Sequence, residues 1–257
     1  MADESPAAFY DGLAHEYHSL FDDWWAAAQW HADVVDRLLQ SLGVAPPARV
    51  LDCACGIGTQ AIPLAQRGYE LTATDISSEA IARATREAAA RAVNLEFAVA
   101  DMRKLDRSIS PPFDAVIACD NAIPHLLDDA DLDTALSSIA SCLGSGGVFV
   151  ASVRDYDALR KDGVSGVPAV LRQRADGREI VGQAWEWSDD LERIRIHLYV
   201  LHEQSAGKWR TSVHSTWYRA LGRASFNEAL LRAGFGDTRW HEPADSGYYQ
   251  PIVTARR

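Results

Sequence analysis

The sequence is poor in cysteine, in positive charge and in long apolar runs. Its four cysteines, at positions 53, 55, 119 and 142, form no Cys-x-x-Cys pair. This argues against a disulfide framework and against a zinc site, and it suits a reducing compartment. No uninterrupted apolar stretch approaches the length of a membrane span, and the opening Met-Ala-Asp-Glu-Ser-Pro is acidic rather than basic. We therefore expect a cytoplasmic protein without a membrane partner.

The shortage of positive charge also bears on partners. The formal net charge is −11, whereas proteins that bind nucleic acids need a basic surface, so we expect no nucleic-acid partner. With 257 residues, 47% of them hydrophobic, the chain is long enough for one large domain or for one domain with an insertion. No internal repeat or low-complexity tract is visible.

The chain is organised around residues 48–68, ARVLDCACGIGTQAIPLAQRG. A short apolar strand ends at Asp52, and a turn with Gly56 and Gly58 leads into a short helix that stops at Gly68. Glycines let the backbone bend sharply and let a ligand approach it closely. A buried strand followed by a glycine-rich turn and a helix is typical of nucleotide-binding βα units, although two glycines also occur in ordinary tight turns.

The next predicted strand, residues 69–74, ends at Asp75. In nucleotide-binding folds an acidic side chain about twenty residues after the glycines binds the ribose hydroxyls. The segment Gly56–Ala61 also satisfies the G-x-G-x-x-A pattern of dinucleotide binding, so an NAD enzyme is an alternative at this point.

The remaining elements follow from hydrophobic periodicity. Helices are predicted within residues 7–42, over 79–92, from Asp128 or Asp129 to Leu143, and over 225–232; strands are predicted at 94–100, 114–119, 148–153, 180–187, 193–201, 209–218, 238–241 and 249–255. Strands that alternate with helices predict an α/β, doubly wound parallel sheet, which binds ligands beyond the carboxyl ends of its strands. The alternation within 193–201 is instead typical of a half-buried antiparallel strand.

These motifs carry a resemblance. Val50 to Thr59 resembles the first motif of the class I S-adenosylmethionine-dependent methyltransferases, with Ala54 where many members have a glycine. Asp75 is similar to the acidic residue that binds the ribose, and 100–102 is similar to the segment beside the adenine. Within the class, the chain is most similar to the glycine and glycine/sarcosine N-methyltransferases. Residues 119–126 are similar to their fourth-strand motif, which contacts the methionine part of the cofactor, and 152–157 to their fifth-strand motif, whose arginine binds the substrate carboxylate.

The resemblance implies a Rossmann-like, seven-stranded methyltransferase sheet with three parts: an N-terminal helical lid (1–44), a core that binds S-adenosylmethionine (45–156 and 222–257), and an inserted antiparallel layer (157–221). It implies cofactor-binding residues Tyr17, Trp24, Asp52, Ala54, Gly56, Gly58, Asp75, Ile76, Asp101, Met102, Cys119, Asp120, Asn121 and His125. Substrate-binding candidates are Arg154, Tyr156, Trp185, Trp217 and Tyr249, and catalytic candidates are His125, His214 and Tyr218. Tyr218 is near the position of a pocket tyrosine in those enzymes, with an ambiguity of one residue against Trp217. No metal is expected.

The expected function is methyl transfer from S-adenosylmethionine to a small molecule, most simply in-line N-methylation of an amine or an amino acid. Positioning and desolvation provide most of the acceleration in such a reaction, because the sulfonium methyl is already electrophilic. O- or C-methylation of a natural-product scaffold remains an alternative, as do an NAD(P)-dependent oxidoreductase and a non-catalytic protein that binds S-adenosylmethionine. The sequence does not indicate an oligomeric state.

Overall fold

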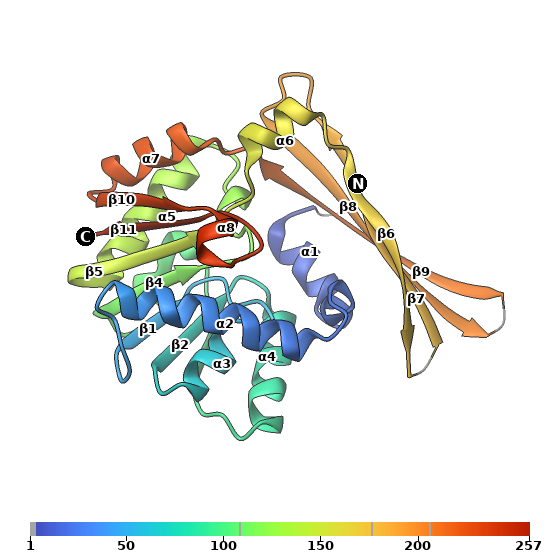
Figure 1. Cartoon of the computed structure of the whole chain (residues 1–257), viewed down its shortest axis with the longest axis horizontal. Coiled ribbons are helices and arrows are strands. Elements are labelled where there is room, and N and C mark those ends of the chain that lie inside the picture. The colour runs from blue at the N-terminus through green and yellow to red at the C-terminus, as the bar shows by residue number, and fades with distance from the viewer. Residues whose placement is uncertain (1–3, 108, 176, 206) are drawn as a thin grey trace.

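The computed structural model describes residues 4–107, 109–175, 177–205 and 207–257, so the start of the predicted lid, 1–3, lies outside the described residues. Two sheets organise the chain, and helix α1 (Pro6–Leu13) at its N-terminal end lies between them (Figure 1). The larger sheet has seven strands in the order β10-β11-β5-β4-β1-β2-β3. Its strands are β1 (Arg49–Asp52), β2 (Glu70–Asp75), β3 (Glu96–Val99), β4 (Phe113–Ala118), β5 (Leu143–Ser152), β10 (Gly236–His241) and β11 (Ile252–Arg256). Only β11 runs against the other described strands of this sheet.

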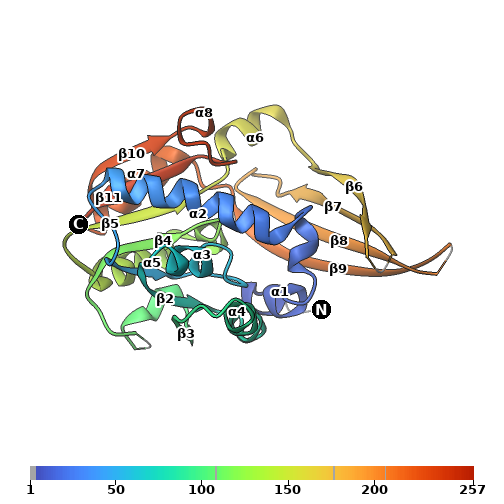
Figure 2. The ribbon, with the colours of Figure 1, turned by 60° about the horizontal axis from the view of Figure 1, so that its bottom comes forward.

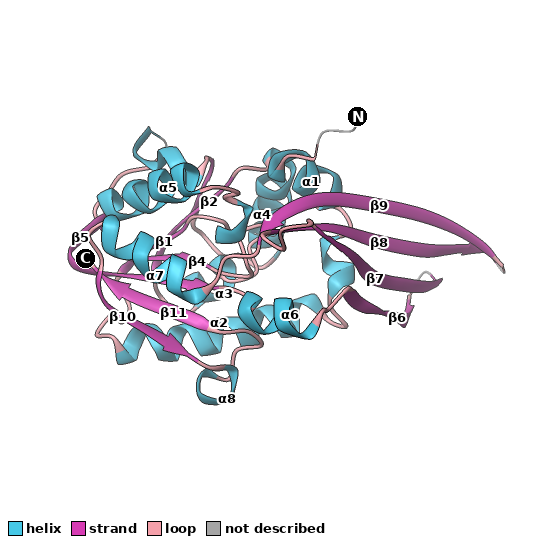
Figure 3. Ribbon diagram, turned by 90° about the horizontal axis from the view of Figure 1, so that it is seen from above, coloured by secondary structure: helices cyan, strands magenta, loops and turns pink. Residues whose placement is uncertain are grey.

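Helices cover both faces of the larger sheet, which confirms the doubly wound α/β prediction. One face packs on α2 (Trp24–Ser41), α3 (Ala61–Gln66) and α4 (Ser78–Ala90), and the other packs on α5 (Asp129–Cys142) and α7 (Arg223–Arg232) (Figure 3). Strand β4 shows why. Ala115 and Ile117 point into the hydrophobic core under α2, α3 and α4, whereas Val116 and Ala118 point into the core under α5 and α7. Because successive side chains of a strand alternate between faces, its continuous apolar run fills two cores.

Helix caps fix the starts of α4 and α5, and the second cap settles the choice between Asp128 and Asp129. The Ser77 hydroxyl accepts the Ala80 N–H at the start of α4, and the Asp128 carboxylate accepts the Asp131 N–H at the start of α5. The predicted N-terminal helices divide into α1 (Pro6–Leu13), a 3₁₀ turn η1 (Tyr17–Leu20) and α2, which Asp23 caps. Two further 3₁₀ segments, η2 (Met102–Arg107) and η3 (Ile123–His125), follow β3 and β4.

The second sheet is antiparallel, as predicted, and has four strands: β6 (Gly166–Arg174), β7 (Gly177–Trp187), β8 (Arg193–Ser205) and β9 (Lys208–Arg219). The sequence predicted the last three and missed β6. This edge strand contains Pro168 and shows no alternating burial, so it lacks the period that identifies a strand. The short helices α6 (Tyr156–Asp162) and α8 (Pro243–Ser246) were also missed.

The N-terminal segment lies between the two sheets. Phe9 and Leu13 of α1 pack against Val181, Leu198 and Val200 on the inner face of the antiparallel sheet. Figure 2 shows α1 near α4 of the larger sheet, and these two helices are in contact. The second sheet and α1 therefore cover the edge at which the parallel strands end. Among the described helices, none is both long enough and apolar enough to span a bilayer.

Candidate active site

The turn after β1 fixes the carboxylate at the end of β2. Gly56 and Gly58 have φ angles of +54° and +91°, in the left-handed region that residues with a Cβ rarely adopt. The Gly56 N–H donates to Asp75 Oδ2 over 2.8 Å, and the Ser77 N–H donates to Asp75 Oδ1 over 2.9 Å. Burial raises the pKa of Asp75 in spite of these bonds. The glycine turn thus holds this carboxylate in one orientation at the edge of the sheet.

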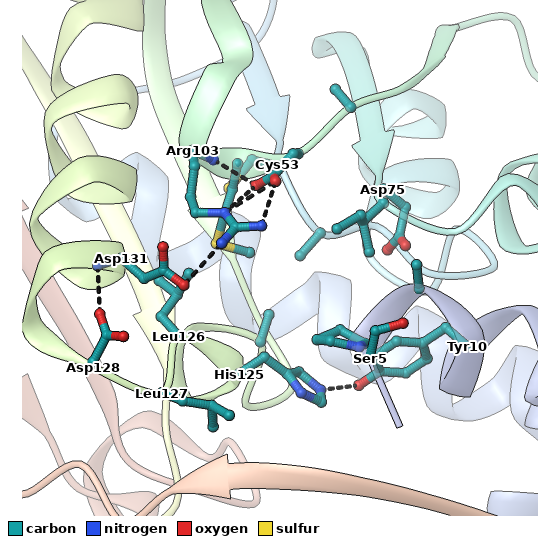
Figure 4. A pocket seen from close by; sticks show the side chains of 18 of the residues that line it. Ser5, Tyr10, Cys53, Asp75, Arg103, His125, Leu126, Leu127, Asp128 and Asp131 are labelled. Atoms are coloured by element: carbon teal, nitrogen blue, oxygen red, sulfur yellow. Dashed lines mark hydrogen bonds and ion pairs between the residues drawn. The ribbon is translucent and has the colours of Figure 1, made fainter. Parts of the chain in front are cut away.

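A cavity of about 430 Å³ lies beside this turn (Figure 4). Six of the predicted cofactor residues line it: Ala54, Asp75, Ile76, Asp101, Met102 and His125. Leu126 adds an apolar wall, and Ser5 and Tyr10 close the cavity from the N-terminal side. Its volume is in the range of about 300–1,000 Å³ that holds small ligands. Apolar walls together with carboxylates suit an aromatic base attached to a hydroxylated sugar.

Arg103 keeps Asp101 ionised at the wall of this cavity. Its Nη2 donates to Asp101 Oδ2 over 2.7 Å, and its Nη1 donates to Asp131 Oδ2 over 2.8 Å (Figure 4). Burial alone would raise the pKa of Asp101, but the hydrogen bonds from Arg103 hold it below its ordinary value. Asp101 therefore remains a charged acceptor beside the cavity.

Asp52 lies beneath the glycine turn and is 1% exposed. Its Oδ1 accepts the Ala54 N–H over 3.3 Å, while its Oδ2 has no hydrogen-bond partner among the described residues. Burial raises the pKa of this carboxyl well above its ordinary value. Because buried polar atoms are nearly always paired, the unpaired oxygen fits a site that an amine or hydroxyl of a ligand completes.

Two consecutive residues after β4 have left-handed backbones. Asp120 has a φ of +58° and Asn121 a φ of +68°, a conformation that costs about 1–3 kcal/mol for each non-glycine residue. Ser152 stabilises the pair, since its hydroxyl accepts the Asp120 N–H over 2.7 Å and its carbonyl accepts the Asn121 N–H over 3.0 Å. The Asn121 side chain then accepts the Arg154 N–H over 3.0 Å and donates to the Tyr156 hydroxyl over 2.8 Å. Asn121 and Tyr156 thus orient the ends of β4 and β5.

The Asp120 carboxylate accepts hydrogen bonds from three side chains. Its Oδ1 accepts the hydroxyls of Tyr248 and Tyr249 over 2.6 and 3.0 Å, and its Oδ2 accepts Gln60 Nε2 over 2.8 Å. The His31 ring lies nearby, with Nδ1 3.9 Å from Asp120 Oδ2. Together with Gly56 and Cys119, Asp120 lines a small cavity of about 40 Å³ that shares residues with the larger one.

A cluster of aromatic side chains joins the N-terminal segment to both sheets. The Tyr10 hydroxyl lies 3.0 Å from His125 Nε2 and 3.3 Å from the Tyr218 hydroxyl. The rings of His125 and Tyr218 have centroids 4.1 Å apart. Burial lowers the pKa of His125 to about 3, so this imidazole is uncharged at neutral pH. The cluster can accept or donate hydrogen bonds, but it contains no strong base.

A second cavity of about 560 Å³ lies on the other side of this cluster, between the N-terminal segment and β6–β8. Tyr10, Tyr17 and Asp120 line both this cavity and the small one, so the three hollows form a continuous row. Arg154, Tyr218 and Tyr249 of the predicted site also line the second cavity. Two rings flank Arg154, whose Cζ lies 5.2 Å from the centroid of Trp185 and 5.4 Å from that of Tyr218. Its Nη1 is buried without a hydrogen-bond partner among the described residues.

Trp24, His214 and Trp217 are among the predicted site residues that line neither of these two cavities. The Trp24 indole N–H donates to Thr59 Oγ1 over 3.1 Å, so Trp24 supports the glycine turn from behind. His214 packs beneath α1, where a Cβ on Gly12 would lie 3.0 Å from its Nδ1. Trp217 donates to Glu4 over 3.0 Å from the face of β9 opposite Tyr218. Because neighbouring strand residues face opposite ways, Tyr218 alone of this pair points toward the cavity.

Sequence reasoning missed Tyr10, His31, Gln60 and Tyr248. Gln60 lies inside the glycine motif, but only the fold shows that its amide reaches Asp120. Tyr10 and His31 belong to the aromatic-rich N-terminal segment that the sequence assigned to a lid, and this aromatic density is the available signal for them. Tyr248 directly precedes the predicted Tyr249.

Known proteins share this architecture. Residues 50–147 match a family model described as a methyltransferase domain. A glycine/sarcosine N-methyltransferase of Parasynechococcus marenigrum (strain WH8102) is 36% identical over 141 residues, which cover 55% of this chain and 49% of that protein. The chain thus spans about half the length of the curated relatives that it matches.

Solved structures with a similar fold cover nearly the whole chain. The CcbJ methyltransferase of Streptomyces caelestis superposes with a TM-score of 0.77 and 20% identity over 99% of both chains. CalS10, an amino pentose methyltransferase from Micromonospora echinaspora with bound S-adenosylmethionine, superposes with a TM-score of 0.73 and 22% identity over 95% of both chains. The matched methyltransferase domain, residues 50–147, thus lies within a fold that solved S-adenosylmethionine-dependent methyltransferases share.

Proposed function

We propose that the protein methylates a nitrogen atom of a small-molecule acceptor that carries a carboxylate, with S-adenosylmethionine as the methyl donor. One observation carries the proposal: the small cavity joins the cavity beside Asp75 to the cavity beside Arg154. It shares Tyr10 and Asp75 with the first, and Tyr10, Tyr17 and Asp120 with the second. Two ligands bound on either side of this junction would have their reacting ends together. The match to glycine/sarcosine N-methyltransferases supports nitrogen as the acceptor atom.

The first cavity and the small one fit the donor. Asp75 is placed to accept the ribose hydroxyls, and Ile76 and Met102 to enclose the adenine. The unpaired Asp52 Oδ2 and the Asp120 carboxylate fit the positively charged end of the methionine part. When bound, S-adenosylmethionine supplies an electrophilic methyl group, which the lone pair of a neutral amine attacks while the carbon–sulfur bond breaks and its electrons stay on sulfur.

The protein's own contribution to this reaction is positioning. The Tyr10 and Tyr218 hydroxyls stand at the junction and can accept an N–H of the acceptor, which fixes the direction of its lone pair. His125 supports Tyr10 and stays uncharged, so it brings no positive charge close to the cationic donor. Aromatic walls tolerate the cationic donor and the ammonium product.

Arg154 determines the class of acceptor. Its guanidinium reaches the second cavity with one unpaired nitrogen, and it offers parallel N–H donors that match a carboxylate. An amino acid has this carboxylate next to the amine that is methylated. The site therefore divides into a donor half beside Asp75 and an acceptor half beside Arg154.

The test is a panel of amino acids, simple amines and phenols incubated with S-adenosylmethionine, with products identified by mass spectrometry and S-adenosylhomocysteine release measured in parallel. N-methylated amino acids are expected. Methylation of phenols or carbon acids with no reaction of any amine would show that the acceptor atom is wrong, while leaving the donor assignment intact.

A further inference from the structure

The second cavity is larger and more apolar than the acceptor of a glycine methyltransferase requires. Glycine has no side chain, whereas this cavity has a volume of about 560 Å³. Cavities of about 300–1,000 Å³ hold drug-sized ligands. Among the described residues that line the cavity, only Asp120, Arg154 and Arg172 have a carboxyl or guanidinium group, and burial lowers the pKa of the one histidine, His31. Most of the remaining wall is aliphatic or aromatic.

The apolar wall comes from β6, the edge strand that the sequence did not predict. The ladder between β6 and β7 shifts register between Val167 and Val170, and Val167, Pro168 and Val170 all line the cavity. Val167 and Val170 are 43% and 44% exposed, so protein atoms cover little more than half of each side chain. Leu20 and Phe21 of the N-terminal segment line the cavity as well. Apolar surface of this kind favours an apolar ligand by about 25 cal/mol for each Å² that is removed from water.

Arg172 does not offer a second site for an anion. Its Nε donates to Asp22 Oδ1 over 2.5 Å, and its Nη1 donates to the Ser19 carbonyl over 3.2 Å. These bonds hold β6 against the N-terminal segment and neutralise the charge at that end of the cavity. The carboxylate of an acceptor is therefore directed to Arg154, and the rest of the acceptor extends toward β6.

We infer that the acceptor has an apolar side chain that lies along β6. It is therefore an amino acid with a branched aliphatic or aromatic side chain, or another amine-bearing carboxylic acid of similar shape, rather than glycine. This inference rests on the proposed N-methylation and adds the identity of the side chain. The reaction is the same: the acceptor nitrogen forms a bond to the methyl carbon, the carbon–sulfur bond breaks with its electrons on sulfur, and the surplus amine proton goes to solvent.

The first experiment compares kcat/KM for glycine, L-alanine, L-leucine and L-phenylalanine. We expect the value to rise along this series, by about tenfold or more for each large step in apolar size. A maximum at glycine would overturn the inference while N-methylation stands. Absence of N-methylation from all four would contradict both proposals.

The second experiment uses neighbouring residues of β6 that face opposite ways. Val170 pairs with Val181, which also lines the cavity, whereas Leu171 pairs with Ile180 and is 58% exposed. We expect Val170→Asp to lower kcat/KM for L-phenylalanine about tenfold or more, because a carboxylate in an apolar wall repels an apolar ligand. Leu171→Asp should leave it unchanged, and both variants should bind S-adenosylhomocysteine as tightly as the unsubstituted protein.

A third variant keeps the test decisive if Val170→Asp folds poorly. Val170→Trp fills the apolar end of the cavity, so it should reduce turnover of L-phenylalanine much more than turnover of L-alanine. An equal effect on both acceptors, or equal effects of Val170→Asp and Leu171→Asp, would show that the acceptor does not lie along β6.

Discussion

The hydroxyl of Tyr10 lies 3.0 Å from Nε2 of His125, although the two residues are 115 positions apart in the chain. Tyr10 belongs to α1 and His125 to η3, so this contact joins the N-terminal segment to the end of β4. Tyr218 of the antiparallel sheet completes the cluster at 3.3 Å from Tyr10. Three parts of the fold thus meet where the proposed donor and acceptor cavities join.

The Tyr218 hydroxyl should matter for turnover, and its neighbour Trp217 should not. Tyr218→Phe removes the hydroxyl but keeps the ring that packs on His125, so we expect kcat to fall about tenfold, as for the loss of one hydrogen bond of about 1–1.5 kcal/mol. Trp217→Phe changes the opposite face of β9 and should leave kcat within about twofold. Single-turnover rates at saturating acceptor measure the difference, and equal rates for the two variants would remove Tyr218 from the site.

Asp75 should contribute to donor binding alone. Asp75→Asn keeps the shape of the side chain but removes its charge, so binding of S-adenosylhomocysteine should weaken by about 1.5–3 kcal/mol, as for a hydrogen bond to a charged group. Calorimetry gives this value directly. Glu79→Gln, an exposed change at the start of α4, is the matched control and should bind normally. Unaltered affinity in folded Asp75→Asn would exclude a ribose role.

Local motifs carry the prediction of the proposed donor half of the site. The glycine turn and the acidic residue at the end of β2 are encoded within about twenty residues, and the strand that carries each is apolar enough to identify. The same local signal predicted Asp101, Asp120 and Arg154, because each directly follows a recognisable strand. The ends of the strands of a parallel sheet meet at one edge, so the order of the motifs along the chain predicts that these residues lie at the same edge.

The proposed acceptor half depends on distant contacts, and the sequence pattern indicates fewer of its residues. The choice between Trp217 and Tyr218 needed the register of β9, since a shift of one residue exchanges the two faces of a strand. The β6 wall was missed because its side chains show no alternation, and Gln60 was missed because its partner Asp120 is 60 positions away, in the turn after β4. Such contacts arise from tertiary structure and leave no local pattern.

His125 should make the protein sensitive to acid. Its pKa is about 3 in the folded protein and near 6.5 in the unfolded chain, so the unfolded state binds the extra proton as the pH falls below about 6.5. Stability should therefore fall between pH 6.5 and pH 3, by up to about 1.4 kcal/mol for each pH unit from this residue. Urea unfolding at pH 7 and pH 5 should show a smaller loss in His125→Gln than in the unsubstituted protein. His15→Gln, at an exposed position, should show the full loss.

The last prediction separates the classes of acceptor, and it concerns Arg154. Lysine keeps the charge but not the parallel donors of a guanidinium, and it cannot stack between Trp185 and Tyr218 in the same way. If the acceptor carboxylate binds here, Arg154→Lys should raise KM for the amino acid by roughly 30-fold or more, which corresponds to about 2–3 kcal/mol, and should leave the affinity for S-adenosylhomocysteine unchanged. Arg160→Lys on α6 is the control and should have no effect, because Arg160 pairs with Asp157 and the Ala220 carbonyl outside the cavities described above. Rapid turnover of an acceptor without a carboxylate, indifferent to Arg154→Lys, would exclude the amino-acid acceptor and would point to a neutral amine held by the aromatic walls alone.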